Sequence, residues 1–428
     1  MPVRIVKGGT LIDGTGREPL EKAVIVIEGS KIAAVGREGE ISVPGSNEVI
    51  DAAGKTIMPG LVDLHVHLSG IATAEAPKMA KDTYLRHLTA SDGLKLVYAT
   101  KHAWETLEAG FTTVRDCGFT SLHHGEELVP LREAIMNDAI PGPRLIVYGW
   151  VSMTAGHADM AFSSVFSRRT EDVADGPWEC RKRVREFVRN GVDGIKTSSG
   201  GGVWGYGEER WWRNYTIEEL TAIADEAHSF GKKVSAHCYT SSQVRNAARA
   251  GIDTMEHGTD MDQETINLIL DKGLFYVPTL LTFSDRTIAL DIAQGTPEWQ
   301  ISKLREAQEE AEGTFRKAHK AGVKIAFGND MWNHLPHGQN AYGLELYVKA
   351  GQSEMEAILS ATRIAAEALG LQDSLGTIEK GKIADMVVVD GDPLRDIKIL
   401  QEKSKLVVIK EGRTIAVNGR HLHGIENA

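Results

Sequence analysis

The chain has 428 residues, of which 42% are hydrophobic, so it can form one large α/β domain and a smaller one. A formal net charge of −11 argues against nucleic acid and against an anionic membrane as the main partner. The three cysteines form no disulfide framework and no Cys-x-x-Cys metal motif, and no apolar run approaches the ~18 residues of a membrane span, so a soluble cytoplasmic protein is expected.

The two ends of the chain share one pattern. Residues 1–58 contain short apolar, β-branched runs that are separated by glycine-rich turns, and residues 373–428 repeat this arrangement. Because both ends flank a middle of different character, they predict one small β-sandwich domain built from both chain termini. Two unrelated β flaps are the alternative.

The middle of the chain, residues 59–372, alternates strand-like runs with helix-like stretches. The strand candidates are residues 61–67, 111–117, 144–150, 194–198, 234–238, 254–258, 275–280 and 324–330. The helix candidates include residues 171–190, 216–230, 241–250, 261–272 and 300–321. Thr216 and Glu219 form a capping box at the start of one of them. Eight strands with helical crossovers predict a (β/α)8 TIM-type barrel, whose active site lies at the C-terminal ends of the strands.

The first predicted barrel strand ends in His65 and His67. Side chains alternate along a strand, so the two imidazoles point to the same face. Two imidazoles at the end of an apolar strand form half of a metal site. A single His-x-His pair also arises by chance in a chain with 15 histidines, so the prediction depends on the later strands.

Later strands end in further residues that can bind metals or transfer protons. These residues are Lys196, His237, His257 and Asp330. Four histidines and one aspartate with open coordination positions suit zinc, or a similar borderline metal, in a hydrolytic site. Lys196 has two interpretations: a carbamate formed with carbon dioxide, which can bridge two metals, or an ammonium paired with a carboxylate such as Asp193.

The chain resembles the amidohydrolase superfamily in the segments HVH, GIKTSSGGG, SAHCYT, TMEHG and FGND. Within it, the chain is most similar to the imidazolonepropionase-like branch of metal-dependent Xaa-Pro and Xaa-Arg dipeptidases and ochratoxin-type amidases. The segments GKTIMPGLVDLHVHL, FTTVRD, GHAD and LGTIEKGKIADMVVVDGDPL extend the resemblance over nearly the whole chain. Asn329 departs from the family pattern, because threonine is commoner at this position.

The resemblance implies two divalent metal ions, expected to be zinc. Residue by residue, it gives one ion to His65, His67 and Asp330 and the other to His237 and His257. Lys196, as N6-carboxylysine, and a hydroxide would bridge the two ions, and Asp330 would transfer protons. The resemblance also implies that His157 polarises the scissile carbonyl and that Tyr239 binds the substrate carboxylate. A loop-capping histidine and a core tyrosine are the respective alternatives.

The predicted function is therefore binuclear amide hydrolysis by a metal-bridging hydroxide, with a carboxylate-bearing small molecule such as a dipeptide or N-acyl amino acid as substrate. Cyclic or xenobiotic amides, ureas and carbamates are alternatives, and a metal-free barrel scaffold is the non-enzyme alternative. Family habit predicts a homo-oligomer. The segment Trp204–Arg213 is expected to line the pocket or a subunit contact, and the glycines at 200–202 are interpreted as loop flexibility beside Lys196.

Overall fold

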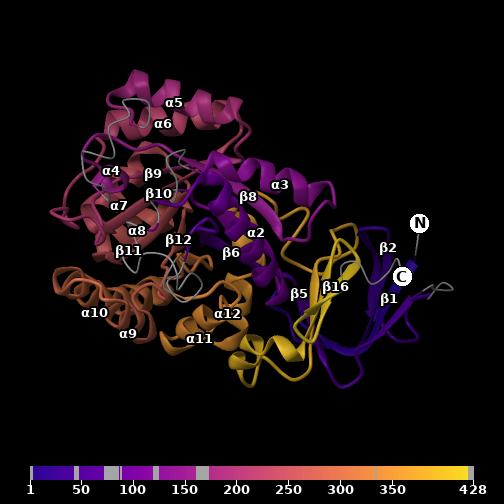
Figure 1. Cartoon of the computed structure of the whole chain (residues 1–428). Coiled ribbons are helices and arrows are strands. Elements are labelled where there is room, and N and C mark those ends of the chain that lie inside the picture. Colours follow the sequence, from indigo (N-terminus) through magenta and orange to yellow (C-terminus); the bar gives the residue numbers. More distant parts are fainter. Residues whose placement is uncertain are drawn as a thin grey trace.

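The computed structural model describes residues 3–42, 48–71, 86, 89–118, 125–160, 173–332 and 335–422. Two sheets organise these residues (Figure 1), one of eight strands in the middle of the chain and one of nine strands from its two ends. Among the described helices, none is long and apolar enough to cross a membrane.

The eight-stranded sheet follows chain order and is parallel throughout. Its strands are β6 (Leu61–Val66), β7 (Phe111–Asp116), β8 (Arg144–Trp150), β9 (Gly194–Ser198), β10 (Lys233–Thr240), β11 (Thr254–Asp260), β12 (Phe275–Val277) and β13 (Lys324–Ile325). The chain beyond β13 returns to β6, because the Leu64 amide donates to the Phe327 carbonyl at 2.9 Å and the Met331 amide donates to the His65 carbonyl at 3.2 Å. The predicted (β/α)8 barrel is confirmed.

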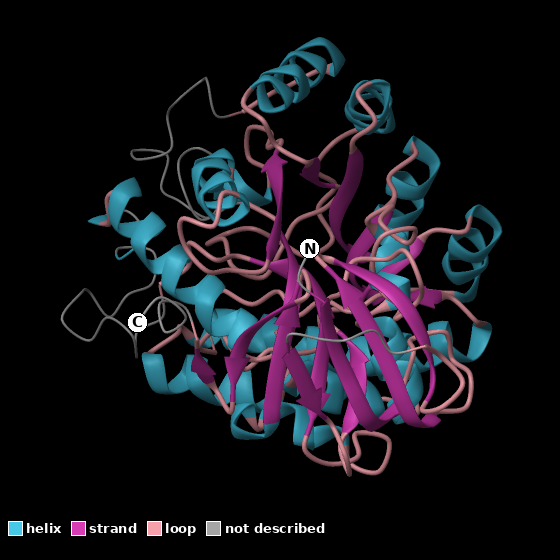
Figure 2. Ribbon diagram, turned by 90° about the vertical axis from the view of Figure 1, so that its right-hand side faces the viewer, coloured by secondary structure: helices cyan, strands magenta, loops and turns pink. Residues whose placement is uncertain are grey.

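Helices separate the strands and cover the barrel (Figure 2). They are α2 (Asp92–Glu108), α3 (Val129–Met136), α4 (His157–Met160), α5 (Pro177–Arg189), α6 (Ile217–Ser229), α7 (Ser241–Ala250), α8 (Gln263–Lys272), α9 (Asp285–Gln294), α10 (Glu298–Ala321), α11 (Tyr342–Lys349), α12 (Glu354–Ser360) and α13 (Arg363–Ala368). The predicted capping box begins α6, because the Thr216 side chain accepts from the Glu219 amide and the Glu219 carboxylate accepts from the Thr216 amide. The helix predicted at 171–190 begins only at Pro177, and residues 171–172 lie outside the described residues.

Two predicted strands are shorter than expected. The strand predicted at 275–280 ends at Val277, because Pro278 has no amide hydrogen to donate and Thr279 has a positive φ of 47°. The strand predicted at 324–330 leaves the regular ladder after Ile325. Both irregular segments lie at the C-terminal side of the barrel, where side chains can turn into the site instead of continuing a strand.

The nine-stranded sheet joins both ends of the chain in the order β17-β16-β15-β14-β5-β1-β2-β3, with β4 paired to β1. Its strands are β1 (Val3–Leu11), β2 (Leu20–Glu28), β3 (Lys31–Arg37), β4 (Glu48–Asp51), β5 (Thr56–Pro59), β14 (Met386–Val389), β15 (Leu406–Lys410), β16 (Arg413–Val417) and β17 (Arg420–His421). Figure 1 shows the indigo and yellow strands side by side at one side of the barrel.

This sheet folds over one apolar core. The Ile32 amide donates to the Lys382 carbonyl at 2.9 Å, so the edge at β3 meets the segment that precedes β14. Ile25, Ile57 and Val388 are buried together between the two parts of the sheet. The predicted β-sandwich from both chain ends is confirmed, and two unrelated flaps are excluded. The boundaries at residues 58 and 372 stay predictions.

Candidate active site

A cavity opens at the C-terminal ends of the barrel strands. Residues from six different strand ends and loops converge on it. The cavity is lined by His65, His67, Trp150, His157, Trp204, His237, Tyr239, His257, Asp330 and Trp332. Seven of the eight predicted site residues are therefore on its wall, and the eighth, Lys196, lies buried beside Trp150.

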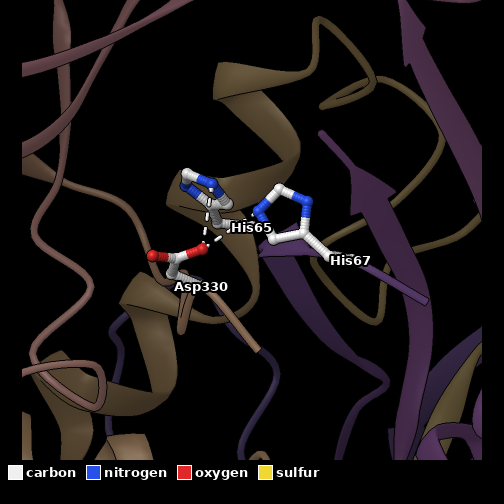
Figure 3. A group of neighbouring side chains, drawn as sticks. All are labelled: His65, His67 and Asp330. Carbon is white, nitrogen blue, oxygen red and sulfur yellow. Dashed lines mark hydrogen bonds and ion pairs between the residues drawn. The ribbon is translucent and has the colours of Figure 1, made fainter. Parts of the chain in front are cut away.

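His65, His67 and Asp330 form one group on this wall (Figure 3). Asp330 Oδ1 lies 3.0 Å from His67 Nε2 and 3.5 Å from His65 Nε2. The three ligand atoms lie within 4.8 Å of one another, so one metal ion could contact all three. Asp330 has a positive φ of 57°, an uncommon backbone conformation for a residue other than glycine, and such strain tends to occur at functional sites.

His237 and His257 form a second group directly beside the first. Their ring centroids lie 4.5 Å apart, and the His257 ring lies 5.2 Å from that of His65. His257 has a positive φ of 67°, and its Nδ1 lies 2.8 Å from Thr279 Oγ1. Tyr239 fills the space beside both histidines, with centroid distances of 4.9 Å to His237 and 5.3 Å to His257. The tyrosine is buried, but it lines the cavity.

Lys196 is completely buried, and its Nζ has no hydrogen-bond partner among the described residues. Its ammonium lies 5.2 Å from the centre of the Trp150 ring. The alternative ion pair with a carboxylate such as Asp193 is not formed among the described residues, because Lys196 Nζ has no hydrogen-bond partner there and Asp193 binds the guanidinium of Arg132 at 2.7 Å. A buried cation without a hydrogen-bond acceptor is unfavourable. This position therefore suits a lysine that is chemically modified or that contacts a bound group.

The protonation states of the site suit divalent cations. Burial, followed by the nearby Lys196 ammonium, lowers the pKa of His65 to about 4. Burial also lowers the pKa of His237 and of His257 well below the usual value. Burial opposes ionisation of Asp330, but its histidine neighbours hold the pKa of this carboxyl well below its usual value. Neutral imidazoles and an ionised carboxylate are the forms that bind metals, so the donor set fits the metal dependence that the sequence predicts.

A buried network behind His65 was not identified from the sequence. Glu256 Oε2 accepts from His65 Nδ1 at 2.8 Å, and Glu256 Oε1 accepts from Arg115 Nη2 at 2.7 Å. Burial opposes the charge on Glu256, but Arg115 keeps the pKa of Glu256 below its usual value. His65 therefore carries its hydrogen on Nδ1 and directs Nε2 towards Asp330. Charged residues inside the apolar runs FTTVRD and TMEHG were the available signal.

Asn329 has a structural role next to Asp330. Its side-chain amide donates to Asp63 Oδ2 at 2.7 Å, and the Asn340 amide donates to the same oxygen at 2.8 Å. Burial raises the pKa of Asp63 to about 6. Since Asp63 belongs to β6, this contact ties the segment that carries Asp330 to the strand that carries His65.

His157 begins α4 and faces His237. The two rings stack with centroids 4.0 Å apart and planes inclined by 14°. His157 Nδ1 donates to Glu208 Oε1 at 2.9 Å, and Glu208 is itself buried. His157 is therefore part of the cavity wall rather than a histidine that only caps a loop. Glu208 was seen in the sequence only as part of a charged, tryptophan-rich run.

The segment Trp204–Arg213 is divided between the cavity and the surface. Trp204 lines the cavity and packs edge-on against Trp332, with ring centroids 5.6 Å apart. Tyr206 and Trp211 are 81% and 66% exposed. The pocket-lining alternative is thus confirmed for Trp204, and a subunit contact of the exposed residues stays a prediction.

The glycines before this segment are packed closely against the site, and the flexibility of the loop stays a prediction. A Cβ at Gly200 would lie 2.0 Å from the Gln243 side chain, and a Cβ at Gly202 would lie 2.1 Å from the His157 ring. Gly200, Gly201 and Gly202 are buried. These glycines allow the backbone to pack closely against the site.

The chain is similar to several known proteins over nearly its whole length. The chain is 30% identical to an ochratoxinase of Aspergillus niger over 442 residues, which cover 96% of this chain and 86% of the relative. A solved Xaa-Pro dipeptidase with methionine bound in its active site is 34% identical, with a TM-score of 0.86 and coverage of 96% and 98% of the two chains. A solved prolidase complexed with N-methylphosphonate-L-proline is 30% identical, with a TM-score of 0.86 and coverage of 97% and 100%. The model of the amidohydrolase family matches residues 56–417, and this chain belongs to that family.

Proposed function

We propose that this amidohydrolase cleaves an amide bond to an amine that carries a carboxylate, such as the C-terminal residue of a dipeptide or an N-acyl amino acid. The observation that carries the proposal is the convergence of two histidine groups and Asp330 on one cavity next to the buried Lys196. Relatives that are named as a dipeptidase with bound methionine and as a prolidase support a substrate of the amino acid class.

The proposed cofactor is a pair of divalent ions, with zinc as the expected metal. His65, His67 and Asp330 would hold one ion, and His237 and His257 would hold the other. Lys196 would lie between them as N6-carboxylysine: its amine nitrogen forms a bond to the carbon of carbon dioxide and loses a proton, which leaves a carbamate with two oxygen donors. When bound, the ions would lower the pKa of water and polarise the substrate carbonyl.

Asp330 is the proposed proton-transfer residue. Its carboxylate points into the cavity beside His65 and His67, with Oδ1 3.0 Å from His67 Nε2. It can accept a proton from the attacking water and donate it to the departing amine nitrogen. Amide hydrolysis needs this second transfer, because an amine that leaves without a proton is a poor leaving group.

His157 and Tyr239 are the proposed substrate contacts. His157 Nδ1 donates to Glu208, and to polarise the carbonyl of the substrate His157 would contact its oxygen through Nε2. Burial raises the pKa of Tyr239 well above its usual value, so its hydroxyl keeps its hydrogen and can donate to a carboxylate.

The first experiment combines metal content per chain with the release of free amino acids from dipeptides and N-acyl amino acids. We expect about two metal ions per chain and turnover of substrates with a free carboxylate. Metal without turnover of any of these compounds would contradict the proposed substrate class. A protein that contains no metal after growth with zinc and bicarbonate would instead support the scaffold alternative.

A xenobiotic amide is the second candidate, because one similar protein is an ochratoxinase. An ochratoxin-like amide belongs in the same panel, together with cyclic amides, ureas and carbamates. Preferential cleavage of one of these compounds would favour the second candidate. We also propose a cytoplasmic homo-oligomer, and light scattering of the purified chain would test the oligomeric state.

A further inference from the structure

Glu208 is a buried carboxylate that three hydrogen bonds hold beside the cavity. It is 1% exposed, and its Oε1 accepts from His157 Nδ1 at 2.9 Å and from the Gly202 amide at 2.7 Å. Its Oε2 accepts from the Gly205 amide at 3.1 Å. One side chain therefore connects the catalytic-site histidine with the turn that carries Trp204.

The surrounding residues hold this carboxylate in place. A Cβ at Gly205 would lie 2.6 Å from Glu208 Oε2, so the glycine allows the backbone to approach the carboxylate. Lys303 of α10 donates from Nζ to the Glu208 carbonyl. Arg210 binds Glu310, also of α10, at 2.6 Å. The turn is thus anchored to the helix next to it, and Glu208 has little freedom to leave His157.

We propose that Glu208 is a positioning residue for hydrolysis and acts through His157. An ionised carboxylate only accepts hydrogen bonds, so this contact keeps the hydrogen on Nδ1 and turns the opposite nitrogen, Nε2, away from Glu208. This inference rests on the proposed substrate contact of His157, and it adds a residue to which no metal or substrate role has been given.

A double-mutant cycle tests this proposal. The variants are Glu208→Gln, His157→Asn and the two combined. Glu209→Gln is the matched control, because Glu209 is in the same turn and the change affects its distant ion pair with Lys303, at 3.8 Å. We expect Glu208→Gln to lower kcat/KM about 10- to 100-fold, chiefly through kcat, and Glu209→Gln to leave it unchanged. The double variant should lose no more than His157→Asn alone. Losses that multiply in the double variant would overturn the proposal.

A spectroscopic measurement tests the contact without any turnover. In protein labelled with 15N-histidine, His157 should give an Nδ1–H signal that is protected from exchange, identified by its absence in His157→Asn. Glu208→Gln should shift this signal, whereas Glu209→Gln should not. The absence of such a signal in the unmodified protein would also overturn the proposal, even where Glu208→Gln fails to fold.

The proposed function and the Glu208–His157 contact can fail separately. If the unmodified protein hydrolyses none of the amides in the panel, the proposed function fails and the NMR signal still decides the Glu208–His157 contact. If hydrolysis proceeds but His157→Asn leaves kcat/KM unchanged, amide hydrolysis stands, whereas the positioning role of Glu208 is contradicted.

Discussion

Two buried carboxylates accept hydrogen bonds from histidines of the cavity, and they differ in the other groups that they contact. Glu256 accepts from His65 Nδ1 at 2.8 Å and is neutralised by the guanidinium of Arg115, with all three side chains on barrel strands. Glu208 accepts from His157 Nδ1 at 2.9 Å and otherwise meets backbone amides in a turn between β9 and α6.

This difference separates a part of the site that lies on barrel strands from a part that lies on a loop. The Glu256 pair belongs to the barrel framework, so its loss would disturb the predicted metal ligands. The Glu208 pair belongs to a loop that is anchored to α10, so it can change while the barrel strands stay in place. Metal binding and substrate handling should therefore respond to different mutations.

The largest effect is expected at Lys196, the buried lysine of β9 beside the cavity. Lys196→Ala should remove the proposed bridging carbamate, lower kcat/KM by about 10³-fold and reduce the metal content per chain. Added short carboxylic acids should restore part of the activity by occupying the vacated position. Lys233→Ala is the control, since Lys233 lies on the neighbouring strand β10 with an exposed side chain paired to Asp253. Full metal content and activity in Lys196→Ala would contradict the carbamate.

The next effect separates metal binding from proton transfer. Asp330→Asn keeps an oxygen donor but loses the proton acceptor, so most of the metal should remain while kcat falls about 10²- to 10³-fold. Metal analysis and steady-state kinetics on the same preparation measure both quantities. Full activity in this variant would remove Asp330 from the proton-transfer role.

Loss of Glu256 and loss of Glu208 should differ in their effect on metal affinity. Glu256→Gln should weaken metal binding about 10- to 100-fold, because it alters the hydrogen bond that orients His65. Glu208→Gln should leave metal affinity unchanged and affect turnover alone. Competition with a chelator measures both variants, and the exposed Glu264 of α8 provides a Gln control. Equal metal affinity in the Glu256 and Glu208 variants would abolish the distinction between the two parts of the site.

The smallest effect concerns substrate recognition. Tyr239→Phe removes a single hydroxyl, and losing a hydrogen bond to a charged group corresponds to an increase in KM of about 10-fold. This increase should occur for substrates with a free carboxylate and be absent for their carboxamides. A KM increase of the same size for both would contradict the assignment of the carboxylate to Tyr239.

The site residues at the strand ends could be predicted from the sequence, because side chains alternate along a strand and the barrel strands follow chain order. His65 and His67 share a face by their spacing alone, and β6 to β13 pair in chain order, so residues at successive strand ends had to meet. The ends of two strands were predicted too long, because the hydrophobic pattern continues past Pro278 and past Ile325 while the backbone leaves the ladder.

The supporting carboxylates could not be predicted in the same way. Glu256 reaches His65 across 191 residues of sequence, and Glu208 reaches His157 across 51. Neither pair has a fixed spacing or shares a strand, so only the packed structure reveals which acid meets which imidazole. The role of the glycines at 200–202 could not be predicted either, because their tight packing against Gln243 and His157 depends on tertiary contacts.

The strand that carries His65 is tied to the far end of the chain. β5 runs through Gly60 directly into β6, and β5 pairs with β14. Just beyond β14, the Gly391 carbonyl accepts from the Thr56 hydroxyl across 335 residues of sequence. During synthesis the β5–β14 pairing therefore has to wait until the whole barrel has been made. Bringing together segments so distant in sequence is a slow folding step. Completion of the fold and ordering of the strand that carries His65 should therefore occur together, and a chain that ends before β14 should lack both.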